Sequence, residues 1–330
     1  MMGKYIVIGL GSMGKRRVRC LQALGVEPKN IIGFDTRKDR RDESKNSYGI
    51  EVVEKLDDVN TDELLGVIVS LPPDKHYIGA KYAIDNGLPA FIEASVVLDD
   101  VKKIKEANRN NVYIMPSDTF VHHPVIKIIK SLVKSGKYGK VTNFSYHSGQ
   151  YLPDWHPWED VNDFYVSNRV TGGAREIVPY ELTWLTDVFG YPKEIKGYFK
   201  KTAEIGCDIE DSYAAALNYD DMTGTLTVDV VSRYVARDLI VNMQNGQIRW
   251  RWDSRHVELY DALAGKTEFI EQGEAIHNDK YGAHIDENMY IEEIDCYLKG
   301  AKGEMETNTI EKDIKVLELL SELEDSDGGF

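Results

Sequence analysis

Three glycines near the start of the chain have the spacing needed to hold a phosphate group. Gly9, Gly11 and Gly14 follow a short apolar run as G-x-G-x-x-G, and Ser12 and Met13 lie between them. In this pattern the first glycine allows a tight turn, the second lets the backbone approach a pyrophosphate, and the third lets a helix pack on the preceding strand. The helix amino terminus then faces the phosphates. The motif therefore predicts a dinucleotide-binding turn, although glycines alone also fit a strand-to-helix turn without a ligand.

A carboxylate further along the chain supports the dinucleotide interpretation. Asp35 ends the apolar run IIGFD, about twenty residues after the last glycine, where it can accept hydrogen bonds from an adenosine ribose. The same carboxylate would repel the extra phosphate of NADP, whereas Arg37, Arg40 and Arg41 could attract it. Because the carboxylate is nearer the ribose, NAD is the expected cofactor and NADP the alternative.

The elements that must position these residues follow from the alternation of apolar and polar stretches. Residues 1 to 120 alternate strand and helix signals, which predicts a doubly wound parallel sheet of the Rossmann type. From Val141 the strands alternate in polarity and are joined by tight turns, as an antiparallel sheet with one covered face requires. The dipeptide Asn245-Gly246 predicts a two-residue hairpin loop, because both positions tolerate positive φ.

These patterns together predict an α/β protein of two domains. A Rossmann dinucleotide-binding domain is expected over residues 1–122. An α/β substrate and oligomerisation domain, with a large, open, mainly antiparallel sheet, is expected over residues 123–330. A sheet with one open face commonly pairs with a copy of itself, so we expect a homodimer or homotetramer.

Composition excludes several classes of function. The 330 residues are 42% hydrophobic and 29% charged, which is ordinary for a soluble globular protein. A formal charge of −15 argues against a nucleic-acid partner, because such binding needs clustered lysine and arginine. Three widely separated cysteines indicate neither a disulfide framework nor a metal site. No apolar run approaches the roughly 20 residues that span a bilayer, and no signal peptide is evident, so we expect a cytoplasmic protein without a membrane partner.

Several motifs together resemble the Gfo/Idh/MocA family of nicotinamide-dependent oxidoreductases. They are GLGSMG, SLPPDKHYIGA from Ser70, FIEAS from Phe91, HPVIKIIKSLVKSGKYGKV from His123, TGGAREIVPYELTWLTDVFG from Thr171 and NMYIEEIDCYLKG from Asn288. The resemblance covers nearly the whole chain and implies a Rossmann domain joined to an α/β domain with a large open sheet.

The resemblance also implies positions for the cofactor. Ser70, Leu71, Pro72 and His76 would lie beside its ribose and nicotinamide, with Glu93 nearby. A simpler interpretation also stands, in which the prolines end a strand and His76 is an ordinary residue of a helix first turn.

The chain departs from the family at positions that carry chemistry. Family members usually have Glu-Lys-Pro where this chain has Glu93, Ala94 and Ser95, and the resemblance implies that the lysine binds the substrate hydroxyl and assists proton transfer. That lysine is absent, although Ala94 keeps its place beside the expected cofactor. In the glycine-led helix, the family's aspartate matches Ile177, and its histidine matches Tyr180 or Glu181.

Hydride transfer at a carbinol carbon needs a side chain that takes or gives the hydroxyl proton. Tyr180 is one candidate, since it lies about one helical turn beyond Glu176 and Arg175 could favour its phenolate form. His123 is the other, because histidine titrates near neutrality. The alternatives are a core aromatic for Tyr180, a neighbour of a helix cap for His123, and a surface ion pair for Arg175 and Glu176.

An aromatic and acidic segment between a strand and a helix suits a sugar substrate. Trp155 and Trp158 offer apolar faces for the C–H side of a sugar ring, and Arg175 and Glu176 are expected to contact the same substrate. A packed interface loop is the alternative for this segment. No metal site is expected, because no histidine and carboxylate motif has the required spacing.

The leading hypothesis is an NAD(P)-dependent oxidoreductase that acts on a hydroxyl or keto carbon of a sugar or sugar derivative, including nucleotide-linked sugars of surface-polysaccharide metabolism. A second hypothesis keeps the cofactor but changes the reaction. The protein would then be a lyase or hydrolase that retains NAD and oxidises its substrate transiently. A third is a dinucleotide-binding module without catalysis.

Overall fold

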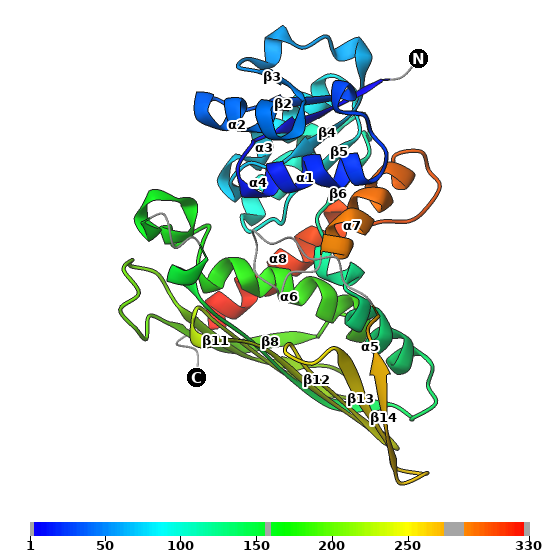
Figure 1. Ribbon diagram of the computed structural model, residues 1–330. Helices are drawn as coiled ribbons and strands as arrows, with labels where there is room; N and C mark the ends of the chain where they lie inside the picture. The colour runs from blue at the N-terminus through cyan, green and yellow to red at the C-terminus, as the bar shows by residue number, and fades with distance from the viewer. Residues whose placement is uncertain (1–2, 156–159, 274–286, 327–330) are drawn as a thin grey trace. The chain divides into compact units, whose positions relative to one another are not determined.

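The computed structural model describes residues 3–155, 160–273 and 287–326 (Figure 1). The chain forms two compact units. The first unit comprises Met1–Thr119 and Glu287–Ile314, and the second unit comprises Phe120–Asp286 and Lys315–Phe330. Within the described residues, no helix is both long and apolar enough to cross a membrane.

The first unit is built on a parallel sheet of six strands in the order β3-β2-β1-β4-β5-β6. The strands are β1 (Lys4–Ile8), β2 (Ile31–Phe34), β3 (Glu51–Val53), β4 (Leu64–Val69), β5 (Ala90–Ile92) and β6 (Ile114–Pro116). The central strands β1 and β4 are largely apolar and buried, because helices cover both faces of a parallel sheet. The predicted doubly wound Rossmann sheet is confirmed.

Among the described residues, five α-helices belong wholly to the first unit. They are α1 (Ser12–Ala23), α2 (Lys38–Tyr48), α3 (His76–Asp85), α4 (Leu98–Ala107) and α7 (Glu287–Gly300). The sequence analysis assigned α7 to the second domain, whereas its residues Ile294 and Tyr297 are fully buried in the core that α1 and the sheet form. The hydroxyl of Tyr297 donates to the carbonyl oxygen of Pro89 at 2.9 Å. The packing of α7 in the first unit depends on contacts between residues far apart in sequence, which local patterns do not encode.

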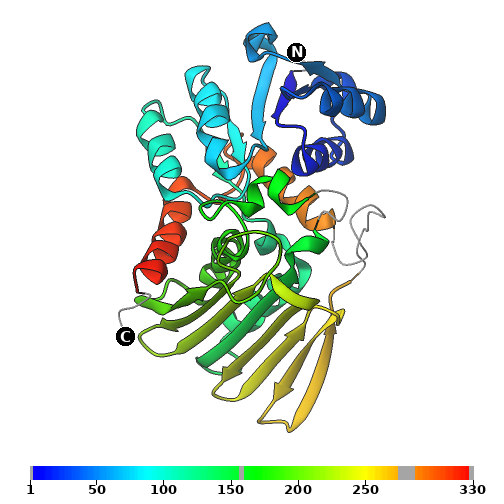
Figure 2. The ribbon, with the colours of Figure 1, turned by 90° about the vertical axis from the view of Figure 1, so that its left-hand side faces the viewer.

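The second unit contains a sheet of eight strands in the order β14-β13-β12-β11-β7-β10-β9-β8 (Figure 2). The strands are β7 (Val141–Tyr151), β8 (Glu194–Lys200), β9 (Ser212–Asn218), β10 (Thr223–Asp229), β11 (Val231–Met243), β12 (Gly246–Arg251), β13 (His256–Asp261) and β14 (Lys266–Glu271). All neighbours are antiparallel except β7 and β10. The predicted large, mainly antiparallel sheet is confirmed, and the homo-oligomer inferred from its open face stays a prediction.

Helices cover one face of this sheet. Helix α6 (Ala174–Phe189) lies along it, with α5 (Pro124–Lys134) beside α6 (Figure 1). Helix α8 (Ile310–Ser326) contributes its residues from Lys315 onward to the same unit. Helix α6 is bounded by Gly173 and Gly190, whose φ values of +64° and +82° suit glycine at helix boundaries.

The hairpin between β11 and β12 differs in detail from its prediction. Met243 pairs with Gly246, so the loop residues are Gln244 and Asn245, and neither is among the described residues with positive φ. A side chain at Gly246 would be crowded for a different reason: a Cβ there would lie 3.0 Å from the carbonyl oxygen of Tyr260 and 3.1 Å from the ring of Tyr138.

Candidate functional site

The turn between β1 and α1 gives each of the three glycines a separate role. Gly9 has φ +96°, and a Cβ at this position would collide with the carbonyl oxygen of Ser70. A Cβ on Gly14 would collide with the carbonyl oxygen of Gly9. By contrast, a Cβ on Gly11 would meet only the guanidinium of Arg40, at 3.5 Å. Gly9 and Gly14 are therefore required by the fold, whereas Gly11 leaves open space at the start of α1 that a phosphate can use.

Asp35 lies directly after β2 and is held by the turn itself. Its two carboxylate oxygens accept the backbone N–H groups of Leu10 and Arg37, each at 2.8 Å. The Arg37 side chain, in contrast, pairs with Asp39 in an exposed fork. Two other arginines approach Asp35: Arg40 Nη1 lies 3.6 Å from the carboxylate, and Arg41 Nη1 donates to the backbone carbonyl oxygen at 2.7 Å. The carboxylate is thus fixed at the end of β2, and Arg40 and Arg41, rather than the side chain of Arg37, lie against Asp35.

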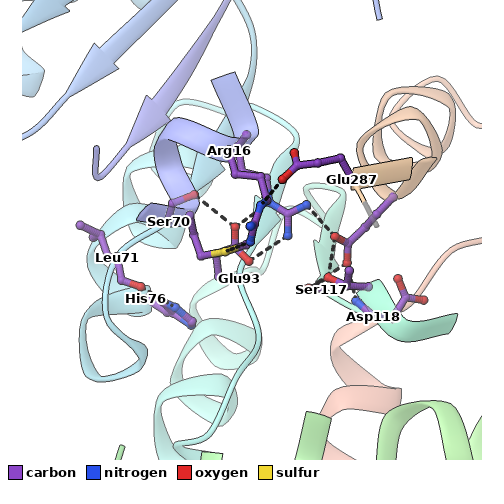
Figure 3. Close-up of polar contacts among 12 residues, drawn as sticks. Arg16, Ser70, Leu71, His76, Glu93, Ser117, Asp118 and Glu287 are labelled. Carbon is purple, nitrogen blue, oxygen red and sulfur yellow. Dashed lines mark hydrogen bonds and ion pairs between the residues drawn. The ribbon is translucent and has the colours of Figure 1, made fainter. Parts of the chain in front are cut away.

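The end of β4 brings further predicted cofactor residues together (Figure 3). The backbone N–H of Ser70 donates to the carbonyl oxygen of Ile8 at 2.8 Å, which ties the end of β4 to β1. The buried ring of His76 donates from Nε2 to the carbonyl oxygen of Leu71 at 3.0 Å. Burial lowers the pKa of His76, so the ring is neutral and fixes the loop that contains Pro72.

Glu93, after β5, belongs to a buried ion-pair network (Figure 3). Its carboxylate accepts hydrogen bonds from Nε and Nη2 of Arg17, at 2.6 and 2.9 Å, and from the hydroxyl of Ser70, at 3.3 Å. The Nη1 of Arg17 lies 2.6 Å from the carboxylate of Glu293, and both of these side chains are fully buried. Burial opposes the charge on Arg17, but the two carboxylates raise its pKa well above the ordinary value. The half-buried Ala94 follows directly.

Glu293 links this network to the end of β6. It accepts hydrogen bonds from the hydroxyl groups of Ser117 and Thr119 and from the backbone N–H of Asp118, all at 2.8 Å. The sequence analysis did not identify Arg17 and Glu293, because charged residues within helices are usually solvent-exposed. The sequence does contain a sign of this network. The basic run KRR directly follows the glycines, and its last residue, Arg17, occupies a position that is buried in the fold.

In the second unit, helix α6 presents Tyr180 and Glu181 in different environments. Glu181 is fully buried and accepts hydrogen bonds from four donors. They are the hydroxyls of Tyr146 and Ser148, the indole of Trp184 and Nε of Arg237, at distances from 2.7 to 3.2 Å. This carboxylate therefore has a structural role. Of the two positions that could match the family's histidine, Tyr180 is the half-buried one, and it interacts electrostatically with Arg237.

His123 differs from its expected behaviour. Its ring is 3% exposed, stacks on Phe120 at 5.0 Å between centroids, and accepts the backbone N–H of Val125 through Nδ1 as the cap of α5. Burial, assisted by the nearby positive charge of Arg237, lowers the pKa of His123 to about 3. The expectation that this residue titrates near neutrality is wrong, because the desolvated ring stays neutral.

Arg175 and Glu176 do not form the ion pair considered in the sequence analysis. Arg175 makes a fork with the carboxylate of Glu324, at 2.7 and 3.1 Å. Glu176 accepts the hydroxyl of Tyr165 at 2.9 Å, and its other oxygen is buried without a hydrogen-bond partner in the described part of the chain. Burial raises the pKa of Glu176 to about 8, although the bond from Tyr165 opposes this shift.

The aromatic segment is only partly described. Trp155 is half-buried after β7, whereas Trp158 lies outside the described residues. Among the residues that the structure describes, no group of three His, Cys, Asp or Glu side chains could hold a metal ion.

Comparison with known proteins supports the division of the fold into a parallel and a mainly antiparallel sheet. Residues 3–115 match the model of an oxidoreductase family with an NAD-binding Rossmann fold, and residues 126–249 match the GFO/IDH/MocA C-terminal domain. None of the curated proteins searched matches the chain significantly.

Several solved structures share the fold over almost the whole chain. An oxidoreductase from Agrobacterium radiobacter, in complex with NAD+, L-tartaric acid and magnesium, has a TM-score of 0.83 at 13% identity, covering 99% of this chain and 97% of that one. Levoglucosan dehydrogenase, in complex with NADH and levoglucosan, has a TM-score of 0.81 at 13% identity, with the same coverage. The UDP-N-acetylglucosamine 3-dehydrogenase of Acidithiobacillus ferrooxidans has a TM-score of 0.77 at 14% identity, covering 100% and 99%.

Proposed function

The chain belongs to the Gfo/Idh/MocA family of NAD-binding oxidoreductases, and from this premise we propose that it transfers hydride to or from a hydroxyl or keto carbon of a sugar or sugar derivative. Two proteins of the same fold, levoglucosan dehydrogenase and UDP-N-acetylglucosamine 3-dehydrogenase, are named for sugar substrates. These names support a carbohydrate substrate class, and a nucleotide-linked sugar falls within it.

The observation that carries the proposal is the turn between β1 and α1. Its open position at Gly11, the helix start behind it and the fixed carboxylate of Asp35 fit a dinucleotide. The turn would hold the pyrophosphate, and Asp35 would bind the adenosine ribose. Residues after β4 and β5 would hold the nicotinamide end, namely Ser70, Leu71, Pro72, His76, Glu93 and Ala94. When bound, NAD accepts the hydride in oxidation and supplies it in reduction.

The chain itself must move the hydroxyl proton. With the lysine absent and His123 neutral in its buried cap position, Tyr180 is the residue that we assign to this step. In its phenolate form, Tyr180 would accept the proton from a substrate hydroxyl during oxidation, and the resulting phenol would return it during reduction. Arg237 supports this role, because this buried cation, which binds Glu181, also interacts electrostatically with Tyr180 and places positive charge near its hydroxyl. Such a group contributes roughly 10²- to 10⁴-fold in rate.

We assign substrate recognition in the second unit to Trp155 and Glu176. The indole of Trp155 offers an apolar face to a sugar ring. Glu176 keeps one buried oxygen without a partner in the described chain, and a sugar hydroxyl would satisfy it.

The test measures NADH formation or consumption with purified protein across a panel of sugars, sugar acids and nucleotide-linked sugars. We expect turnover with at least one of them, and Tyr180→Phe should lower kcat by about 10²-fold or more while NAD affinity stays unchanged. Tyr260→Phe is the matched control, because this tyrosine is exposed on β13 and should behave like wild type. Absence of turnover across the panel, with NAD demonstrably bound, would contradict the proposal. Equal loss in both variants would contradict the role of Tyr180.

A further inference from the structure

Arg237, on β11, is a buried cation whose hydrogen-bond donors are mostly unused by the described chain. Its Nε donates to Oε1 of Glu181 at 3.2 Å, whereas its Nη1 and Nη2 make no hydrogen bond to any described residue. The side chain keeps 9% of its surface exposed, so a small ligand can reach it. Buried N–H groups in proteins are normally paired. The free end of this guanidinium therefore suits an acceptor that comes from a ligand.

The buried arginine of the first unit shows how many carboxylates one guanidinium can hold. Arg17 binds Glu93 through Nε and Nη2, and its Nη1 lies 2.6 Å from the carboxylate of Glu293. Arg237 is also buried, but among the described residues it contacts the single carboxylate of Glu181. The comparison indicates that a second carboxylate can bind on the free side of Arg237.

The guanidinium of Arg237 is held in a fixed orientation. Its Cζ lies over the rings of Phe120 and Trp252, at 4.9 and 4.7 Å from their centroids. The backbone N–H of Trp252 donates to the carbonyl oxygen of Arg237 at 2.9 Å, which ties the residue after β12 to β11. With its Nε on Glu181 as well, the side chain has little freedom to lose when a ligand binds.

The donors in this cluster define the chemistry of the ligand. The indole Nε1 of Trp252 is buried without a hydrogen-bond partner in the described part of the chain, so it is an unpaired donor like the Nη atoms of Arg237. A carboxylate supplies acceptors only, and its two oxygens match the planar fork of a guanidinium. A hydroxyl group, in contrast, also brings a donor that needs an acceptor.

A phosphate fits this cluster less well than a carboxylate. It carries more negative charge, and the carboxylate of Glu181 already faces the same guanidinium. The ring of His123, 5.6 Å from that of Trp252, is neutral and adds no compensating charge. The local charges therefore favour a ligand with one negative charge.

The cluster lies beside the residue that we assign to proton transfer. The ring of Tyr180 is 5.7 Å from that of Phe120, so Tyr180 and Arg237 pack against the same aromatic side chain. All of these residues belong to the second unit. We propose that Arg237 and the indole of Trp252 form a carboxylate-binding subsite, and that the substrate is an acidic sugar whose carboxylate this subsite holds. This inference rests on the proposed function, whose substrate class it narrows.

The test measures Kd by isothermal titration with the full chain at neutral pH, in the presence of saturating NADH. Three pairs of ligands differ in the carboxylate: D-glucuronate and D-glucose, D-galacturonate and D-galactose, and UDP-D-glucuronate and UDP-D-glucose. In at least one pair the acid should bind at least about tenfold more tightly than the neutral sugar. The corresponding uronamide, which lacks the charge, should bind like the neutral sugar. An equal gain with the corresponding sugar 6-phosphate would overturn the assignment to a carboxylate.

Variants then locate the effect. Arg237→Lys keeps a positive charge beside Glu181 but lacks the planar fork, so the advantage of the acid should fall to about threefold or less while NADH affinity is unchanged. Arg249→Lys is the matched control, because Arg249 is exposed on β12, and the advantage should be kept. Trp252→Phe retains an aromatic ring without the N–H, and acid affinity should fall about threefold or more. This variant and the ligand pairs decide the question even when Arg237→Lys fails to fold.

The failures are distinguishable. Absence of NADH binding, or of turnover with every sugar, would overturn the proposed function. NADH binding and turnover of neutral sugars without a preference for the acid in any pair would overturn this inference alone. A preference that is the same in Arg237→Lys and Trp252→Phe as in wild type would do so as well.

Discussion

Asp35 illustrates how a single side chain is fixed by the fold before any ligand binds. Both of its carboxylate oxygens accept hydrogen bonds from backbone N–H groups of the flanking loops. The position of its charge at the end of β2 is therefore the same for either cofactor. An additional phosphate on the ribose would be repelled by this carboxylate, although Arg40 lies close enough to reduce the effect. The balance favours NAD.

Substitution at this position should change the choice of cofactor. In Asp35→Ser the repulsion is removed while Arg40 remains, so we expect the affinity for NADPH relative to NADH to rise roughly tenfold. Fluorescence titration of both nucleotides measures this ratio. Addition of Arg40→Ala should reverse the gain, and an unchanged ratio in Asp35→Ser would contradict the assigned position of the ribose.

Glu176 should give the stability of the second unit a characteristic pH dependence. Its folded-state pKa of about 8 lies above the ordinary carboxyl value. The stability that comes from the protonated form is therefore complete below the unfolded pKa and is lost as pH rises through 8. Wild type should lose at least about 1 kcal/mol between pH 5 and pH 8 relative to Glu176→Gln.

Thermal unfolding of the two proteins at both pH values measures this difference. Glu324→Gln is a useful comparison, because that carboxylate is ion-paired with Arg175, and its removal should destabilise the protein at both pH values. Parallel pH dependences in wild type and Glu176→Gln would show that Glu176 does not titrate as described.

At the scale of secondary-structure elements, Arg17 joins parts of the first unit that are far apart in sequence. It lies on α1 and contacts Glu93 after β5 and Glu293 on α7, and Glu293 in turn holds the segment after β6. Three buried charges are stable together only because each is paired and hydrogen-bonded. The network therefore fixes the edge of the sheet that would receive the nicotinamide.

Removal of the central cation should be costly. Arg17→Met leaves two buried carboxylates without their partner, and we expect a loss of about 3–5 kcal/mol in the free energy of unfolding. Arg19→Met is the matched control on the same helix. Its guanidinium is 22% exposed and 3.4 Å from Glu287, so its loss should cost no more than about 1 kcal/mol. Urea denaturation compares the two, and similar costs would contradict the structural role of the network.

At the scale of the whole molecule, the first unit is made from two separated parts of the chain. Helix α7 supplies Ile294, Cys296 and Tyr297 to the core around β1 and β4. A fragment of residues 1–122, which the sequence patterns alone define as a domain, lacks these side chains and Glu293, one of the two carboxylate partners of Arg17. We expect this fragment to be unfolded or aggregated by circular dichroism. Cooperative unfolding of the fragment would contradict the importance of α7.

Local sequence patterns predicted much of this architecture. Apolar runs and glycine spacing identified the parallel sheet and the turn at Gly9, because neighbouring residues alone determine these features. The pairing of β7 with β10, the return of α7 and the network around Arg17 depend on contacts between distant residues, which no local pattern records. For the same reason the sequence could nominate His123 by residue type but could not show that the fold desolvates its ring.

The most direct test of the account is equilibrium binding of NAD+ to wild type and to Gly11→Ala. Gly11 has φ −69°, and an added Cβ meets only Arg40 at an ordinary contact distance, so the variant should fold with an unchanged Tm. The added methyl group would, however, occupy the space proposed for the pyrophosphate. We predict that wild type binds NAD+ with a Kd in roughly the micromolar to millimolar range usual for enzyme substrates and that Gly11→Ala binds at least about tenfold more weakly. Failure of wild type to bind NAD+ or NADH, or equal binding by the variant, would contradict the account.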